Sequence, residues 1–136
     1  MSTAAPQMLL LGTGGVGQAV LQRHARLRAQ GLSLPPLAWL GNARRLVPAI
    51  HDPAAALARA LALPREGGIA GHRLAAARLR AGDVLVDASD SDAAAACHPD
   101  WLSAGIHVVT ANKLGAGGPL ARQQAVVRAQ LAGGAS

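Results

Sequence analysis

Aromatic residues are nearly absent from the chain, which has no phenylalanine, no tyrosine and only two tryptophans. Hydrophobic residues make up 51% of the sequence and are mainly Ala, Leu and Val, so a core must be built from small aliphatic side chains. Helices that pack on a sheet through Ala-rich faces suit this composition. At 136 residues the chain has the length of one domain.

The lack of aromatic side chains also weighs against nucleic-acid binding. The net charge of +6 favours such a role, but single-strand binders stack bases on aromatic rings, and none are interleaved with the arginines. Most arginines fall on the polar faces of Ala-rich stretches, where they are solvated. We expect no nucleic-acid partner.

Cysteine-rich patterns, long apolar runs and a charged leader are also missing. The single Cys97 excludes an internal disulfide and a cysteine-based zinc site, in agreement with a reducing compartment. No run approaches the roughly 18 to 20 apolar residues of a membrane span, and the start of the chain lacks the positive charge of a secretory signal. We expect a cytoplasmic protein that does not enter a membrane.

Lysine occurs only once, at Lys113, beside twelve arginines. An ammonium group is a compact charge whose pKa a protein can lower, whereas a guanidinium stays protonated. The single lysine is therefore a candidate for chemistry, with chance as the simpler explanation.

Strand-like and helix-like segments alternate along the sequence. Short apolar runs predict four strands, at residues 7–11, 34–40, 83–87 and 106–110. Helical patterns predict helices at residues 16–30, 53–63, 71–80, 99–104 and 119–131. Strands that alternate with helices imply a parallel sheet with helices on both faces. The predicted fold class is α/β, as a single doubly wound, Rossmann-like domain over residues 1–136.

Glycines crowd the turn between the first predicted strand and the first predicted helix. This strand–turn–helix context is the one that a G-x-G-x-x-G coenzyme loop needs, and the segment that satisfies the pattern is Gly12, Thr13, Gly14, Gly15, Val16 and Gly17. Gly12 permits a tight turn, Gly14 leaves the backbone bare for a pyrophosphate, and Gly17 lets the helix approach the strand. The helix N-terminus then offers N–H groups and partial positive charge to the phosphates. The alternative is a glycine-rich turn without a ligand.

The end of the second predicted strand lacks the acidic residue that usually binds the ribose hydroxyls of NAD. Asn42, Arg44 and Arg45 stand there instead, and no acidic residue occurs between Gly17 and Asp52. Two arginines would pair with a ribose 2′-phosphate, so we expect NADP as the coenzyme. If the arginines are only surface charges, Asn42 accepts NAD equally well.

Four segments of the chain resemble, in order and spacing, the nucleotide-binding half of homoserine dehydrogenase. They are residues 12–17, 41–44, 86–89 and 105–113. The last segment, Gly-Ile-His-Val-Val-Thr-Ala-Asn-Lys, is the most specific, and the resemblance is closest to the form fused to aspartate kinase. It implies an oxidoreductase that interconverts homoserine and aspartate 4-semialdehyde with NAD(P)H, on the route to threonine and methionine.

The resemblance also implies roles at the matching positions of the first half of the chain. Gly12, Gly14 and Gly17 would hold the pyrophosphate. Asn42 and Arg44 would meet the adenosine ribose or its phosphate.

In the second half of the chain, the resemblance implies that Ser89 lies by the nicotinamide ribose. Asn112 and Lys113 would face the nicotinamide and the substrate, and the ammonium of Lys113 would polarise a carbonyl or transfer a proton. A surface role for the lysine is the alternative.

In the resembling family, a further strand and a catalytic domain follow the matched part, and this chain stops before them. The substrate-binding acid and a second lysine would be missing, and positioning supplies much of an enzyme's rate. We expect coenzyme binding with little or no turnover by this chain alone. The alternative is a stand-alone NAD(P)-sensing or regulatory module. The sheet edge left by the missing strand is a candidate for pairing with a second copy as a homodimer.

Two other groups of residues invite chemical interpretations that we do not favour. Cys97 and His98 suggest a thiol with its base, but adjacent residues on a helix point about 100 degrees apart, so we expect an inert thiol. Asp87, Asp90 and Asp92 suggest a metal site. We expect instead that Asp87 accepts backbone N–H groups and that Asp90 or Asp92 caps the next helix, with no metal bound.

Overall fold

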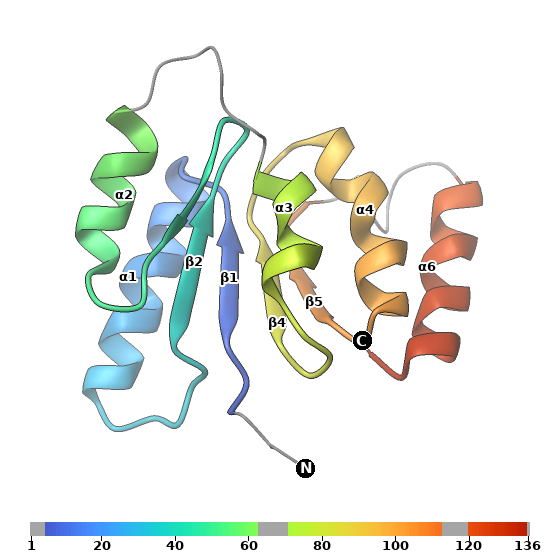
Figure 1. Ribbon diagram of the computed structural model, residues 1–136, viewed down its shortest axis with the longest axis horizontal. Coiled ribbons are helices and arrows are strands. Elements are labelled where there is room, and N and C mark those ends of the chain that lie inside the picture. The colour runs from blue at the N-terminus through green and yellow to red at the C-terminus, as the bar shows by residue number, and fades with distance from the viewer. Residues whose placement is uncertain (1–4, 63–70, 113–119, 136) are drawn as a thin grey trace.

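The computed structural model describes residues 5–62, 71–112 and 120–135. These residues form a five-stranded sheet in the order β3-β2-β1-β4-β5, in which only β3 is antiparallel to its neighbour (Figure 1). The strands are β1 (Met8–Leu11), β2 (Leu37–Gly41), β3 (Leu46–Pro48), β4 (Val84–Asp87) and β5 (His107–Thr110). The helices are α1 (Gly15–Ala29), α2 (Pro53–Ala62), α3 (Gly71–Arg78), α4 (Asp92–Ser103) and α6 (Leu120–Gly133). The predicted α/β, Rossmann-like fold is confirmed.

The short strand β3 is an addition to the four strands that the sequence predicts. It pairs with β2 through Leu46 opposite Gly41 and Val47 opposite Leu40. The connecting turn is closed by a hydrogen bond of 2.9 Å from the Asn42 N–H to the Arg45 carbonyl oxygen. Three residues are too few for an alternating pattern to stand out, and therefore this strand was missed.

Two clusters of aliphatic side chains hold helices against opposite faces of the sheet. Met8 and Leu10 of β1 belong to the cluster that contains residues of α1 and α2, whereas Leu9 and Leu11 belong to the cluster that contains residues of α3 and α4. This division follows from the alternation of side chains along a strand. Helices α1 and α4 thus leave neighbouring strands toward opposite faces.

Helix α4 begins earlier than the sequence predicts, at Asp92 instead of Pro99. Its N-cap is Ser91, whose Oγ accepts a hydrogen bond of 3.1 Å from the Ala94 N–H. The expectation that Asp90 or Asp92 caps this helix is therefore wrong. The helix continues through Pro99, and its buried residues are Ala94, Ala95, His98, Trp101 and Leu102.

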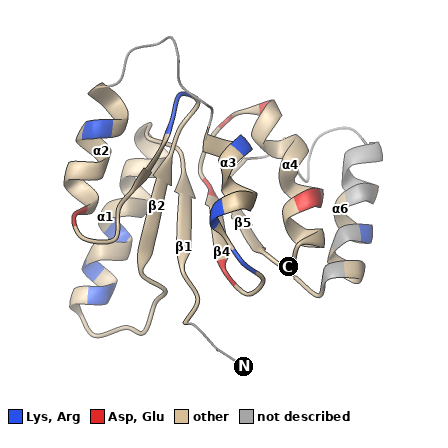
Figure 2. Ribbon diagram, viewed as in Figure 1, with Lys and Arg blue, Asp and Glu red and all other residues tan. Residues whose placement is uncertain are grey.

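Strand β5 lies at one edge of the described sheet, where Val109 is 57% exposed. Pairing of this edge with a second copy stays a prediction. Basic residues of the described ranges are spread over α1, α2, α3, α6, the turn between β2 and β3 and the loop before β4 (Figure 2). None of the helices within the described ranges combines the length and the apolar character needed to cross a membrane.

Candidate coenzyme site

Two glycines of the turn between β1 and α1 are required by close packing. Gly12 has a φ of 125°, and a Cβ there would lie 2.8 Å from the carbonyl oxygen of Ala88. A Cβ at Gly17 would lie only 1.9 Å from the carbonyl oxygen of Gly12. A side chain at Gly17 would therefore push the first turn of α1 away from the end of β1.

Gly14 and Gly15 are glycines for a different reason, because a Cβ at either position would meet no atom within 4 Å. Gly14 is the N-cap of α1, no side chain caps this helix, and its first turn contains no acidic residue. The N–H groups of a first helical turn have no partner within the helix and carry partial positive charge. The bare backbone at Gly14 is thus suited to an anionic group of a ligand.

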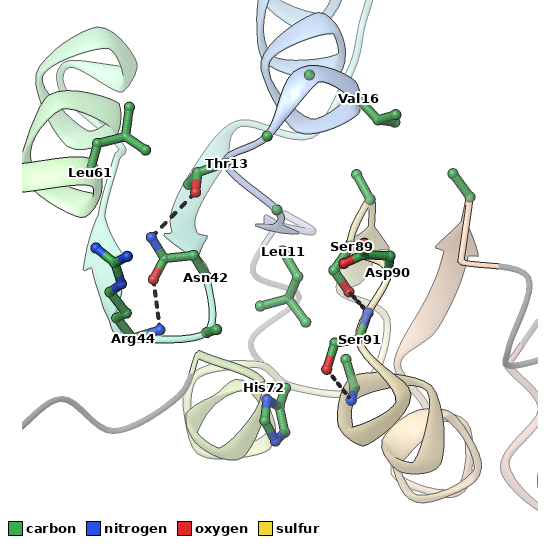
Figure 3. Close-up of a pocket in the computed structure, with 17 residues that line it drawn as sticks. Leu11, Thr13, Val16, Asn42, Arg44, Leu61, His72, Ser89, Asp90 and Ser91 are labelled. Atoms are coloured by element: carbon green, nitrogen blue, oxygen red, sulfur yellow. Dashed lines mark hydrogen bonds between the residues drawn. The ribbon is translucent and has the colours of Figure 1, made fainter. Parts of the chain in front are cut away.

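A pocket of about 530 Å³ opens beside this turn, where the carboxyl ends of the parallel strands meet (Figure 3). It is the place where the connections leave β1 and β4 toward opposite faces, and open α/β sheets bind ligands at such a point. Its lining residues are Leu11, Gly12, Thr13, Gly14, Gly15, Val16, Asn42, Ala43, Arg44, Leu61, His72, Ala88, Ser89, Asp90, Ser91, Ala94 and Ala111.

Asn42 follows β2 and ties together one wall of the pocket. Its Nδ2 donates to Thr13 Oγ1 at 3.3 Å and to the Ala60 carbonyl oxygen at 3.1 Å. Its Oδ1 accepts from the backbone N–H of Arg44 at 2.9 Å (Figure 3). It also accepts from the backbone N–H of Arg45 at 3.0 Å. The side-chain amide therefore joins the glycine turn, α2 and the turn between β2 and β3.

The two arginines of this turn are placed differently. Arg44 is half-buried and lines the pocket, where Figure 3 shows it beside Asn42. Arg45 is exposed and does not belong to the lining. Of the two predicted phosphate partners, only Arg44 therefore lies at the pocket.

The opposite wall follows β4 and begins with a buried carboxylate. Asp87 is 0% exposed, and its Oδ1 accepts hydrogen bonds from the backbone N–H of Ser89 at 3.0 Å and from Ser89 Oγ. Burial by itself raises the pKa of Asp87, but hydrogen bonds from His98 and Ser89 outweigh this effect and hold the pKa below its usual value. The carboxyl is therefore ionised at neutral pH, and the expectation that it accepts a backbone N–H is confirmed.

Asn112 lies just beyond β5 and does not belong to the lining of the pocket. It is 3% exposed, and its Nδ2 donates to Asp87 Oδ2 at 3.2 Å and to the Ser91 carbonyl oxygen at 2.8 Å. The preceding residue, Ala111, lines the pocket instead. Lys113 lies outside the described residues. The predicted contacts of Asn112 and Lys113 with nicotinamide and substrate stay predictions.

The structure brings most of the predicted coenzyme-binding residues to one pocket. Gly17, Arg45 and Asn112 are the predicted positions that do not line it. Sequence reasoning missed several residues that do, among them Leu61 near the end of α2 and His72 at the start of α3.

His72 reaches the pocket because α3 packs tightly on the end of β2. The Gly71 N–H donates to the Asn42 carbonyl oxygen at 2.8 Å, and a Cβ at Gly71 would lie 3.0 Å from Gly41 Cα. Burial, and then the charge of Arg73, lower the pKa of His72. In the sequence, the glycines at positions 41 and 71 are the one indication that His72 lies at the pocket. They permit a close approach between two segments that are far apart in the chain.

Cys97 and the acidic residues near it are the other groups that the sequence offers as candidates for chemistry. Cys97 Sγ donates to the Ala93 carbonyl oxygen at 3.4 Å, and burial, followed by the charge of Asp100, raises the pKa of the thiol. In residues 5–62, 71–112 and 120–135, no three His, Cys, Asp or Glu side chains are grouped so that they would hold a metal ion.

A profile of the family described as "Homoserine dehydrogenase, NAD binding domain" matches residues 12–136. No match was found among the curated proteins. Homoserine dehydrogenase from Thermoplasma acidophilum is similar in structure, with a TM-score of 0.68 and 21% identity over 96% of this chain and 41% of that chain.

Two further solved structures share the fold. A putative homoserine dehydrogenase from Archaeoglobus fulgidus has a TM-score of 0.67 and 21% identity over 96% of this chain and 41% of that chain. A Candida auris protein of unknown function has a TM-score of 0.59 and 21% identity over 91% of this chain and 35% of its own. The chain thus spans about 41% of the length of the two dehydrogenases.

Proposed function

Because the chain belongs to the homoserine dehydrogenase family, through its match to the NAD-binding domain, we propose that it is the coenzyme-binding portion of an enzyme that interconverts L-homoserine and L-aspartate 4-semialdehyde. This reaction serves the synthesis of threonine and methionine. The observation that carries the proposal is the bare, uncapped N-terminus of α1 at Gly14, which faces a pocket at the carboxyl ends of the parallel strands.

A nicotinamide dinucleotide would lie in the pocket in one orientation, with its two halves at opposite ends. The pyrophosphate would lie over Gly14, where the backbone has no side chain in its way. The adenosine half would extend toward Asn42 and Arg44, at the end of β2, and the nicotinamide half toward Ser89 and Ala111, beyond β4 and β5. The bound coenzyme would supply or accept the hydride.

NADP is the coenzyme that the wall at β2 favours. Arg44 offers a guanidinium beside the ribose position, where an acidic residue would repel a 2′-phosphate. Arg45 is exposed outside the lining and would contribute through its charge only. NAD remains the weaker ligand in this proposal.

Hydride transfer would need groups beyond this domain, since the two similar dehydrogenases are more than twice as long as the segment that matches them. We assign to this chain the binding and orientation of the coenzyme, with little turnover alone. Lys113, which follows Asn112 at the end of β5, would polarise the substrate carbonyl or transfer its proton. In an intact enzyme, Lys113→Met would then lower kcat while leaving coenzyme affinity unchanged. An intact protein that binds NADP without oxidising homoserine would favour a sensing role instead.

Calorimetric titration with NADP and NAD tests the proposed site. Gly14→Val should abolish the binding of both coenzymes, because the new side chain would occupy the place of the pyrophosphate. The melting temperature should stay close to that of the wild type, since the space around Gly14 is open. Undiminished binding by this variant would place the coenzyme elsewhere.

Coenzyme preference is tested by replacing the two arginines one at a time. Arg44→Ala should weaken NADP binding about tenfold or more, as expected for one lost hydrogen bond to a charged group, and NAD binding much less. Arg45→Ala is the matched control, with a smaller effect. Equal losses of NADP and NAD affinity in Arg44→Ala would contradict contact with a 2′-phosphate.

A further inference from the structure

A polar network with three buried members lies below the nicotinamide end of the pocket. We call it the Asp87 network, and it consists of Asp87, Ser89, His98 and Asn112. Asp87 Oδ2 is 2.7 Å from His98 Nε2 and 3.2 Å from Asn112 Nδ2. Asp87 Oδ1 accepts hydrogen bonds from the backbone N–H and the hydroxyl of Ser89. Asp87, His98 and Asn112 are 0%, 2% and 3% exposed.

The direction of the bond between Asp87 and His98 follows from the ionised state of the carboxyl. An ionised carboxylate only accepts hydrogen bonds, so His98 Nε2 carries the proton that they share. The imidazole also contacts the Trp101 ring, whose centroid is 5.5 Å away at an interplanar angle of 38°. His98 thus acts as a fixed donor that reaches from α4 to the end of β4.

Burial of this network costs free energy that an apolar core would not cost. Removal of a carboxylate from water is compensated only when every lone pair and proton finds a partner. In the described residues no buried side-chain nitrogen or oxygen lacks a hydrogen-bond partner. The network is complete, but Leu85, on the same strand, shows that β4 also fills buried positions with aliphatic side chains. The polar groups are therefore better explained by what they position.

The groups that the network fixes belong to one wall of the pocket. Asp87 holds both the backbone and the hydroxyl of Ser89, and Asn112 holds the carbonyl group of Ser91 at 2.8 Å. Ser89, Ser91 and Ala111 line the pocket. The loops after β4 and β5 are thus tied together through Asp87.

We propose that Asp87 and His98 are positioning residues which hold the loops after β4 and β5 in the shape that binds the nicotinamide half of the coenzyme. This inference rests on the proposed function, and it goes further by assigning a role to two residues that do not touch the ligand. The adenosine half would lie at the other wall of the pocket, where Asn42 bonds to Thr13, to Ala60 and to the backbone of the turn after β2. Loss of the network should therefore affect one half of the coenzyme only.

The experiment compares NADPH with 2′,5′-ADP, a fragment that lacks the nicotinamide half, by calorimetry on the 136-residue chain. His98→Phe keeps a ring beside Trp101 but removes the donor to Asp87. It should weaken NADPH binding about tenfold, in line with one lost buried hydrogen bond, and leave 2′,5′-ADP binding unchanged. His98→Gln, which can place an amide Nε2 donor at a similar distance, should restore NADPH affinity.

The matched control is His24→Phe on α1. His24 Nε2 also makes a hydrogen bond of 2.7 Å, to the Pro35 carbonyl oxygen, and His24 does not line the coenzyme pocket. This variant should bind both ligands as the wild type does. Should His98→Phe not fold, as judged by circular dichroism, His98→Met removes the same donor with a more adaptable side chain.

The outcomes separate the two proposals. If the wild type binds both ligands but the loss of the His98 donor weakens them equally, or weakens neither, the positioning role is overturned and the proposed function stands. Failure of His98→Gln to recover NADPH affinity also counts against it. If the wild type binds neither NADPH nor 2′,5′-ADP, the proposed function fails and this inference fails with it.

Discussion

The two ends of the pocket are built by different means. At the end formed by β1, α1 and β2, the turn that lines the pocket is largely bare backbone, because Gly14 and Gly15 leave open space and Gly12 and Gly17 allow close packing. At the end formed by β4, α4 and β5, the shape is held by buried side chains around Asp87. Steric changes should therefore damage the first end most, and loss of a polar partner should damage the second.

The largest effect is expected from Gly17→Ala. The added methyl group would lie 1.9 Å from the Gly12 carbonyl oxygen, so α1 has to move, at a cost above the roughly 1–3 kcal/mol of an overpacked core. We expect loss of coenzyme binding together with a large fall in melting temperature. Gly15→Ala is the control, because its methyl group meets nothing within 4 Å, and its melting temperature should be maintained. Similar melting temperatures for both variants would show that the turn and α1 can shift to accommodate a methyl group at position 17 at little cost in stability.

Asp87→Ala tests the end that is built by side chains. It leaves the donors of His98 and Asn112 buried without their carboxylate, and breaking a buried pair costs about 3–5 kcal/mol. Urea unfolding would measure this loss. Asp83, at the other end of β4, is similarly buried but accepts only backbone N–H groups, from Gln7 at 2.9 Å and Arg80 at 2.8 Å.

Asp83→Ala is therefore the matched control for Asp87→Ala. It should also lower the free energy of unfolding, while the ratio of NADPH to 2′,5′-ADP affinity stays at the wild-type value. A change of this ratio in Asp83→Ala as large as in Asp87→Ala would show that general destabilisation, and not the network, sets the shape of the nicotinamide end.

Acid should weaken the side-chain end selectively. The folded-state pKa of Asp87 lies below its ordinary value of 3.8, so its stabilisation is fully present above that value and is lost as the pH falls through the folded-state pKa. The free energy of unfolding of the wild type should fall more steeply below pH 3.8 than that of Asp87→Asn, which has no carboxyl to protonate at this position. Parallel pH profiles for the two proteins would contradict an ionised Asp87 in the folded state.

The smallest effect is expected at the start of α4. Ser91→Ala removes the hydroxyl that accepts from the Ala94 N–H, and loss of such a cap costs about 1 kcal/mol. Thermal unfolding would detect the change. Ser103→Ala, at the exposed end of the same helix, should leave the melting temperature unchanged. No difference between the two serine variants would mean that the cap contributes nothing to stability.

The backbone-built end was predictable because its signals are local. Gly12, Gly14 and Gly17 lie within six residues, between a short apolar run and a helical pattern, and the structure places the turn there. Asn42 and Arg44 could also be found, since they directly follow the second strand. The separation of Arg44 from Arg45 could not, because it depends on how the turn before β3 is closed.

The side-chain end was only partly predictable. The resemblance indicates Ser89, but the sequence gives His98 only the unfavoured interpretation of a base next to Cys97. Its spacing from Ala94, Ala95 and Trp101 is that of one helical face, but His98 lies outside the helix that the sequence predicts over residues 99–104 and inside α4, which begins at Asp92. A polar residue on an otherwise apolar face was the available clue.

The sequence by itself determined the alternation of the four parallel strands with helices and the bare turn at the head of α1, because strand and helix periodicities and glycine spacing act over a few neighbouring residues. Only the tertiary structure decided that Asp87 would meet His98 and Asn112, which lie 11 and 25 residues further along the chain. That meeting depends on the rotation of α4, which its cap at Ser91 helps to set, and on the parallel pairing of β4 with β5. A buried carboxylate is stable only where such distant partners converge on it.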